Sequence, residues 1–285
     1  MTVSTIYKSA AGQKKIAAWI ETQLQQFKLT AQKIMTPEGD AHFIESGNPD
    51  KPAVLMLPGT NFSALSYQAY FALLGGDFRL IALDLMGQPG RSSPVRPKFK
   101  DVAYSKWIKA VLDALKIDKA HLVGHSLGGL IALQTAHVAP ERVGKLILLD
   151  PAGIISLSVT PHLIWKSMPF VIRPNERSSK QLLELMSPHP IDAAMIEWMM
   201  LVGKYVKSSL APPALSQAEL RQIPHEVLVI SGEKDVFLPA AKLRQKTQQS
   251  FTKGQVKIVP DAGHLLPQEQ PEVVASYIRE FLAYS

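Results

Sequence analysis

Three side chains could together perform nucleophilic catalysis: Ser126, Asp235 and His264, in that order along the chain. A serine hydroxyl is a poor nucleophile at neutral pH, so it needs a base within hydrogen-bond reach, and that base needs an orienting carboxylate. Each of the three residues comes just after a short apolar run that is typical of a buried strand. The sequence therefore predicts acyl-transfer chemistry if the fold brings these residues together.

The sequence around the serine reads Gly124-His125-Ser126-Leu127-Gly128, which matches the G-x-S-x-G pattern of a nucleophile elbow. A short apolar run over residues 120–123 precedes it, and a helix-like run over residues 129–138 follows it. We expect a sharp turn between strand and helix that holds the hydroxyl clear of the backbone, with glycine where a side chain would collide. The N-terminus of the helix would favour developing negative charge.

Strand-like and helix-like runs alternate from residue 53 onward. We expect strands at residues 53–57, 79–83, 120–123, 143–149, 227–230 and 255–259, and helices at residues 63–74, 101–115, 129–138, 239–250 and 269–282. This order predicts an α/β fold with a mostly parallel sheet and helices on both faces, which binds ligands at the carboxyl ends of the strands. Asp101 is a plausible N-cap. An amphipathic helix within residues 1–30, at about 10–28, and a hairpin of residues 32–36 and 41–46 should precede the sheet.

The alternation stops at about residue 152 and resumes at about residue 225. The intervening segment has helical stretches at residues 179–186 and 191–206, separated by proline-rich joints. We interpret residues 152–224 as a helical cap inserted into a core of residues 1–151 and 225–285. The cap and the strand-end loops should line a substrate pocket, for which the candidates are Asn61, Phe62, Trp165, Trp198, Met199, Phe237 and Leu265.

These motifs resemble those of the α/β-hydrolase family, in particular its esterase-like serine hydrolases with a helical cap. The resemblance covers roughly residues 40–285 and rests on GHSLGG at 124–129, GEKDVFLP at 232–239 and DAGHLLPQEQP at 261–271, with weaker matches in LPGT at 57–60 and DLMGQPGRSS at 84–93. It implies the α/β-hydrolase fold.

The resemblance also implies a role for each site residue. Ser126 would attack the substrate carbonyl, His264 would act as base and then as acid, and Asp235 would orient the imidazole. The backbone N–H groups of Thr60 and Leu127 would form the oxyanion hole.

Two loops depart from the family pattern. Pro58-Gly59 stands where relatives usually have His-Gly, and one extra residue separates Gly87 from Gly90. The first change affects the expected geometry of the oxyanion loop, and the second predicts a reshaped pocket floor. Asp84 and Arg91 are expected to tie down the second loop.

Other residues could compete for these roles. Asp150 is a rival acid because some relatives place the carboxylate after the preceding strand, although Asp235 fits its motif better; Asp235 could also be only a turn or capping residue. His125 should pack and form hydrogen bonds, because its side chain leaves the elbow on a different side from Ser126. The remaining histidines show no metal-binding spacing, so neither a metal nor an organic cofactor is implied.

We expect a carboxylesterase that cleaves small to medium apolar esters through an acyl-enzyme on Ser126. Two alternatives stay open: a relative with the same triad that cleaves carbon–carbon bonds or makes peracids, and a ligand-binding sensor with slow or no turnover. A lipase that works at a membrane surface through the N-terminal helix is a weaker alternative. Dehalogenases and epoxide hydrolases are disfavoured because their nucleophile is an aspartate at this position.

Composition narrows the possible partners of this chain of 285 residues. It contains no cysteine, which excludes a thiol nucleophile, disulfides and thiolate zinc sites and suits a reducing compartment. The first residues lack the apolar core of a signal peptide and no apolar run reaches the ~18 residues of a membrane span, so we expect a cytoplasmic protein. The net charge of +7 is mild, and no basic run is interleaved with aromatic residues, so nucleic acid is not expected as a partner. Stable membrane association is not expected either, and the oligomeric state is open.

Overall fold

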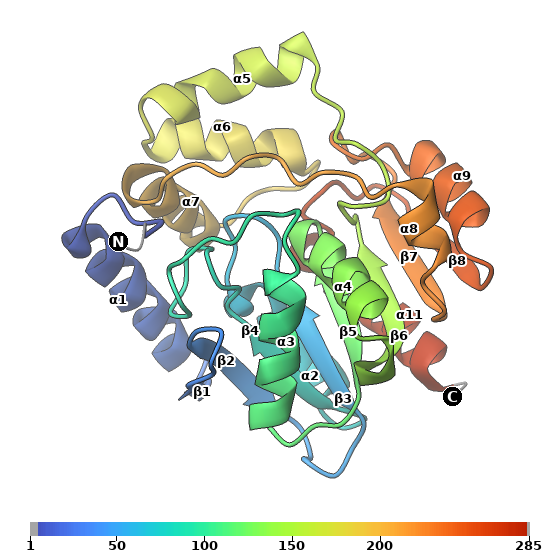
Figure 1. Cartoon of the computed structure of the whole chain (residues 1–285). Coiled ribbons are helices and arrows are strands. Elements are labelled where there is room, and N and C mark those ends of the chain that lie inside the picture. The colour runs from blue at the N-terminus through green and yellow to red at the C-terminus, as the bar shows by residue number, and fades with distance from the viewer. Residues whose placement is uncertain (1–4, 284–285) are drawn as a thin grey trace.

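The computed structural model describes residues 5–283, so the expectations for residues 1–4 and 284–285 lie outside the described residues (Figure 1). A single eight-stranded sheet runs through the described part of the chain, in the order β1-β2-β4-β3-β5-β6-β7-β8. The strands are β1 (Ala31–Ile34), β2 (Ala41–Ser46), β3 (Ala53–Leu57), β4 (Arg79–Leu83), β5 (Ala120–His125), β6 (Val143–Leu149), β7 (Val227–Gly232) and β8 (Gly254–Val259). Strands β3 to β8 pair in parallel, while β1 and β2 form the expected antiparallel hairpin at one edge. The prediction of a mostly parallel sheet is confirmed.

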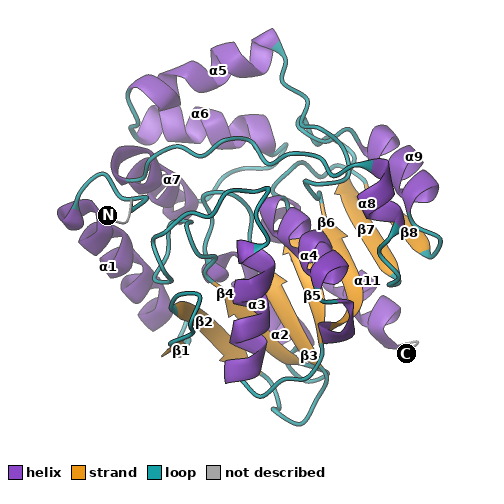
Figure 2. Cartoon of the chain, in the orientation of Figure 1, coloured by secondary structure: helices purple, strands orange, loops and turns teal. Residues whose placement is uncertain are grey.

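Helices cover both faces of the sheet (Figure 2). They are α1 (Ala10–Gln26), α2 (Gln68–Leu74), α3 (Ala103–Ala114), α4 (Leu127–Val138), α5 (Pro161–Ile172), α6 (Glu176–Met186), α7 (Ala193–Tyr205), α8 (Gln217–Arg221), α9 (Ala240–Ser250), α10 (Leu266–Glu269) and α11 (Pro271–Ala283). The sheet has a hydrophobic core on each face, and strand β3 contributes to both. Val54 packs in a cluster with residues of α2 and α11, whereas its neighbour Leu55 packs in the other cluster, with residues of α3 and α4, because successive strand side chains point to opposite faces.

Four helices, α5 to α8, lie between β6 and β7, where the cap was expected. The expected helices at residues 179–186 and 191–206 correspond to α6 and α7, while α5 and α8 were not expected. Figure 1 shows α5 and α6 stacked beyond the carboxyl ends of the parallel strands. This arrangement places the inserted segment over the edge of the sheet where the candidate site residues lie.

The N-terminal helix begins at Ala10, where it was expected, after Ser9, whose side chain accepts the N–H of Gly12. Two other expectations about helix ends were wrong. The expected closing helix divides into α10 and α11, since Pro271 starts a new helix. Asp101 is not an N-cap: α3 begins at Ala103, and its N-cap residue, Val102, makes no side-chain capping bond.

Candidate active site

The turn at Ser126 has the geometry of a nucleophile elbow. Ser126 connects β5 directly to α4, and its φ of 48° and ψ of −113° are strained for a residue with a side chain. A Cβ atom at Gly128 would lie 2.0 Å from the carbonyl oxygen of Leu57, so no larger residue fits beside β3. The close packing of strand, turn and helix fixes the direction in which the serine hydroxyl points.

The three predicted residues form one chain of hydrogen bonds. The hydroxyl Oγ of Ser126 lies 3.1 Å from Nε2 of His264, and Nδ1 of His264 lies 2.7 Å from Oδ2 of Asp235. All three residues are buried, with Ser126 7% exposed. With the proton of the imidazole on Nδ1, this nitrogen donates to Asp235, and Nε2 is free to accept the serine proton.

Asp235 is held in its ionised form. Its second oxygen, Oδ1, accepts the backbone N–H groups of Phe237 and Leu238 at 2.7 and 3.1 Å. Burial by itself would raise the pKa of Asp235, but the attraction and hydrogen bond of His264 and these two N–H groups together hold that pKa below its ordinary value. An ionised Asp235 would stabilise a positive charge on the imidazole of His264.

Asp150, the rival acid, lies beside Asp235 but does not bond to the imidazole. Its Oδ1 accepts the hydroxyl of Ser231 and the N–H of Gly232, both at 2.9 Å, and its Oδ2 has no donor among the described residues. Burial and the neighbouring charge of Asp235 raise the pKa of Asp150 well above its ordinary value. Of the two carboxyl groups, Asp150 is thus the one that holds a proton more readily.

Asp150, Asp235 and His264 also form the one group in the described part of the chain whose ligand atoms, all within 4.8 Å of one another, could in principle hold a metal ion. Two of them are already engaged in the 2.7 Å bond between imidazole and carboxylate. We therefore assign this group to hydrogen bonding rather than to metal binding.

His125 neighbours the serine but cannot serve as its base in this arrangement. Its Nε2 lies 2.8 Å from the carbonyl oxygen of His264, to which it donates, and the ring is buried. Burial, together with the nearby His264, lowers the pKa of His125 to about 3, so its imidazole stays neutral.

The expected oxyanion residues flank the serine. Leu127 is the first residue of α4, so its N–H has no acceptor within the helix. Thr60 belongs to the loop after β3, and this loop approaches the elbow so closely that a Cβ atom at Gly59 would lie 3.3 Å from Cβ of Ser126. Both N–H groups therefore belong to segments that border the hydroxyl.

Two side chains hold the loop that carries Thr60: Gln88, which was not predicted, and Trp198, which was expected only as a pocket residue. Oε1 of Gln88 accepts the N–H of Asn61 at 3.0 Å, and the indole N–H of Trp198 donates to the carbonyl oxygen of Asn61 at 2.8 Å. Asn61 has a positive φ of 67°, a conformation that needs such support. The extra residue between Gly87 and Gly90 was the available signal for Gln88, because it lies in that insertion.

The inserted segment also holds the histidine directly. The backbone N–H of His264 donates to the carbonyl oxygen of Met186, the last residue of α6, at 2.7 Å. His189 follows in the same segment and donates through Nε2 to the carbonyl oxygen of Asp261 at 2.7 Å. Backbone contacts of this kind leave no signature in the sequence.

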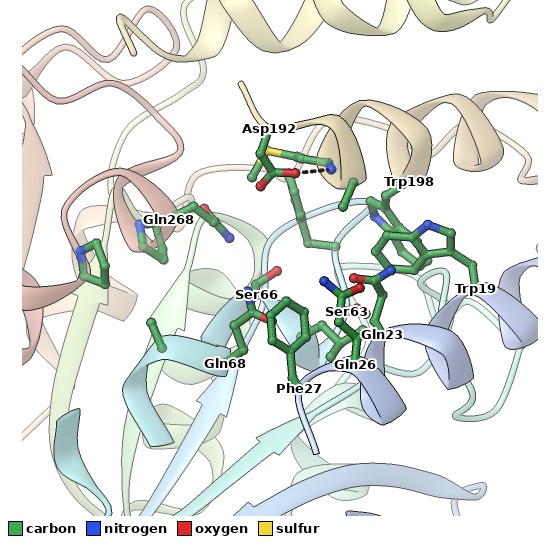
Figure 3. Close-up of a pocket in the computed structure, with 17 residues that line it drawn as sticks. Trp19, Gln23, Gln26, Phe27, Ser63, Ser66, Gln68, Asp192, Trp198 and Gln268 are labelled. Carbon is green, nitrogen blue, oxygen red and sulfur yellow. Dashed lines mark hydrogen bonds between the residues drawn. The ribbon is translucent and has the colours of Figure 1, made fainter. Parts of the chain in front are cut away.

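Apart from Asn61 and Trp165, the expected pocket residues divide into three groups. Phe62 and Trp198 line a cavity of about 320 Å³ between α1, α7 and the loop after β3 (Figure 3), although none of the three hydrogen-bonded residues lines it. Phe237 packs edge-on against the ring of His264, with centroids 5.1 Å apart. Met199 and Leu265 are buried in the core.

Trp165 departs from the expected set. Its side chain is 75% exposed on α5, where it borders an open hollow against Gln181 and Leu185 of α6, away from the three hydrogen-bonded residues. The sequence pattern could not reveal this orientation, since α5 has apolar residues on most of its surface.

A model of the Alpha/beta hydrolase family matches residues 54–277. The chain belongs to this family. Among its relatives, Carboxylesterase YbfK from Bacillus subtilis (strain 168) is 27% identical over 87% of this chain and 86% of its own length. The 2-hydroxy-6-oxo-6-phenylhexa-2,4-dienoate hydrolase of Burkholderia cepacia is also 27% identical, over 85% of this chain and 91% of its own.

The fold of this hydrolase family member is also seen in solved structures. The crystal structure of carboxylesterase CesB (YbfK) from Bacillus subtilis superposes with a TM-score of 0.85 at 24% identity, over 97% of this chain and 100% of that one. Within the described residues of the family member, no helix combines the length and the apolar character needed to cross a bilayer.

Proposed function

We propose that this chain is a carboxylesterase in which Ser126, His264 and Asp235 are the catalytic triad. The observation that carries the proposal is the hydrogen-bonded chain from Ser126 through His264 to Asp235, with distances of 3.1 and 2.7 Å, at a strained strand-to-helix turn. The similarity of the whole chain to Carboxylesterase YbfK supports ester hydrolysis.

The geometry supports a two-step reaction. As Oγ of Ser126 bonds to the ester carbonyl carbon, its proton passes to Nε2 of His264, and the carbonyl oxygen becomes an oxyanion bound by the N–H groups of Thr60 and Leu127. His264 then gives the proton to the alcohol oxygen as the C–O bond breaks, which leaves an acyl-enzyme. Water attacks the acyl carbon with His264 as its base, and the acid is released.

We further propose that residues 152–224 are a cap domain over a core of residues 1–151 and 225–285, and that the 320 Å³ cavity takes the apolar part of the ester. Trp19, Phe27, Phe62 and Trp198 give the cavity aromatic walls. Trp198 also bonds to Asn61, next to the proposed oxyanion residue Thr60, and this bond connects one wall of the cavity to the loop beside Ser126. The size and lining favour small to medium esters with an apolar side.

A carbon–carbon bond hydrolase is the second candidate. The similarity to the 2-hydroxy-6-oxo-6-phenylhexa-2,4-dienoate hydrolase, over 91% of that relative's length, favours it.

We also propose that the protein is cytoplasmic, because the absence of cysteine suits a reducing compartment. Cell fractionation tests this location.

Hydrolysis of a p-nitrophenyl ester series from acetate to octanoate tests the proposal, with the parent and Ser126→Ala assayed together. We expect turnover by the parent and a loss of about 10⁴-fold or more in kcat for Ser126→Ala. If the folded parent cleaves none of these esters but does cleave a vinylogous 1,5-diketone, the carbon–carbon hydrolase replaces the esterase. Equal turnover by Ser126→Ala would refute the assigned nucleophile.

A further inference from the structure

Helix α5 presents an unusual concentration of exposed apolar side chains. The described part of the chain has eleven large hydrophobic residues that are exposed, and six of them lie within fourteen consecutive positions. They are Val159, Ile164, Trp165, Met168, Val171 and Ile172. Scattered exposed apolar residues are normal in proteins, but a contiguous group of this size marks an interaction surface.

These side chains form one face of the helix. At 100° per residue, the five on α5 fall within about 120° of one another, the width of the apolar stripe that normally faces a protein core. Here the stripe is exposed instead: Trp165 is 75% and Ile172 74% exposed, and Trp165, Met168 and Ile172 border an open hollow beside α6. Of the α-helices in the described range, α5 is the one without a buried residue.

The surface around this face is basic. Lys166 and Arg173 lie on or just after α5, and Arg177 and Lys180 lie on the neighbouring α6, all exposed. Only two acidic residues, Glu176 and Glu184, occur between residues 152 and 186, and Glu184 pairs with Lys180 at 3.7 Å. The segment that carries the apolar face therefore has an excess of positive charge, and Lys166 and Glu184 lie beside the face itself.

We propose that the outward face of α5 docks on an anionic lipid bilayer. An amphipathic helix that lies in the plane of the interface combines apolar residues, a tryptophan and flanking lysine or arginine in this way. Anionic headgroups complement the four cations, and the bilayer supplies the apolar phase that the stripe lacks.

Charge argues against a second copy of this chain as the occupant. In a two-fold dimer the same patch lies on both sides of the interface. The cations of one protomer would then approach those of its partner, which costs free energy that an anionic membrane does not.

The position of α5 connects membrane docking to the candidate active site. α5 stacks on the outer side of α6, whose last residue, Met186, binds the backbone of His264 (Figure 1). Docking through α5 would turn the inserted segment toward the membrane, from which apolar esters could enter.

The intrinsic fluorescence of Trp165 offers a direct test. Of the four tryptophans, Trp107 and Trp198 are buried and Trp165 is the most exposed. With vesicles of phosphatidylcholine containing about 30 mol% phosphatidylglycerol, we expect a blue shift of the emission, and binding should weaken when salt rises from about 0.1 to about 0.5 M. Trp165→Phe should lose the blue shift but still co-sediment with these vesicles.

Paired variants locate the binding face. Ile164→Ser with Ile172→Ser should lower the vesicle partition coefficient by about tenfold or more, since both side chains leave the water on binding. Met35→Ser is the matched control, because Met35 is 83% exposed on the β1–β2 connection; it should bind like the parent. Both proteins should keep the parent thermal midpoint and turnover of a soluble ester.

Three outcomes would overturn the proposal. They are no binding of the folded parent to anionic vesicles, equal binding by the double variant, and a dimer in analytical ultracentrifugation that the double variant abolishes. The last result would assign the face to a second copy. None of these outcomes bears on the triad, because the soluble-ester assay reports on it separately.

Discussion

At the scale of single residues, the site contains two adjacent buried carboxyl groups that do different work. Asp235 is ionised because His264 and two backbone N–H groups bind it, whereas Asp150 has only two donors on one oxygen and none on the other. Two adjacent carboxylates repel each other and neither can donate a hydrogen bond, so a proton on Asp150 removes the repulsion.

This division predicts that Asp150→Asn keeps most of the ester turnover. The asparagine carbonyl can accept from Ser231 and Gly232, and its amide can donate toward Asp235 as the protonated acid does. Asp235→Asn, the matched control, should lose about 10⁴-fold in kcat because it holds the wrong imidazole tautomer. Steady-state kinetics on a soluble p-nitrophenyl ester measures both, and a comparable loss in Asp150→Asn would contradict the assignment.

Asp150 should also shape the pH dependence of stability. Because its pKa is raised in the folded state, the stability that it contributes is present below its unfolded value, about pH 4, and is lost as the pH rises toward the folded value. Asp150→Asn removes this loss. In thermal unfolding, Asp150→Asn should therefore have a higher midpoint than the parent at pH 8, and the difference should disappear near pH 4. A difference in midpoint that does not change with pH would contradict the raised pKa of Asp150.

At the scale of elements, the inserted segment contacts His264, the proposed base, through backbone atoms. The end of α6 packs against the loop after β8 so tightly that a Cβ atom at Gly263 would lie 2.3 Å from the carbonyl oxygen of Met186. This is the same carbonyl that accepts the N–H of His264. The inserted helices thus take part in the geometry of the site as well as covering it.

Gly263→Ala should lower kcat by about 10²-fold, because the methyl group must displace either the Met186 carbonyl or the histidine loop by a fraction of an ångström or more. Gly76→Ala is the control, since nothing lies within 4 Å of a Cβ atom there. Kinetics at saturating ester, with circular dichroism to verify the fold, makes the comparison. Parent-like kcat in Gly263→Ala would show that the contact does not position the base.

The sequence predicts the features that depend on residues close together along the chain. The buried strands read as short apolar runs. The three site residues lie in the loops or turns after β5, β7 and β8, so the topology of a parallel sheet was enough to predict their proximity. Helix α5 was missed because apolar residues occupy most of its positions and Pro169 lies within it. Long-range partners such as Gln88 and the Met186 carbonyl depend on how loops meet, which no local pattern encodes.

At the scale of the whole molecule, the N-terminal segment joins the core to the inserted helices. Tyr7 pairs as an isolated bridge with Val206, just after α7, and its hydroxyl donates to the carbonyl oxygen of Gly90 at 2.7 Å. The N–H of Gly90 donates back to the same hydroxyl at 3.2 Å. One buried side chain therefore connects three parts of the chain that are distant in sequence.

Tyr7→Phe should destabilise the protein by about 1–3 kcal/mol, because both polar groups of Gly90 lose their buried partner. For a chain of this size the thermal midpoint should fall by about 2–4 °C per kcal/mol. Turnover per folded molecule should stay close to that of the parent, because Tyr7 is not among the triad or oxyanion residues. An unchanged midpoint would show that water replaces the hydroxyl at no cost.

Covalent trapping of the nucleophile tests the central claim most directly. The parent, Ser126→Ala and His264→Ala would be treated with diethyl p-nitrophenyl phosphate, and intact-mass and peptide mass spectrometry would locate the adduct. Our account predicts one diethylphosphoryl group per chain on the peptide that contains Ser126, none on Ser126→Ala, and a rate lowered by about 10³-fold or more in His264→Ala. A parent that hydrolyses esters but is labelled elsewhere, or not at all, would contradict it.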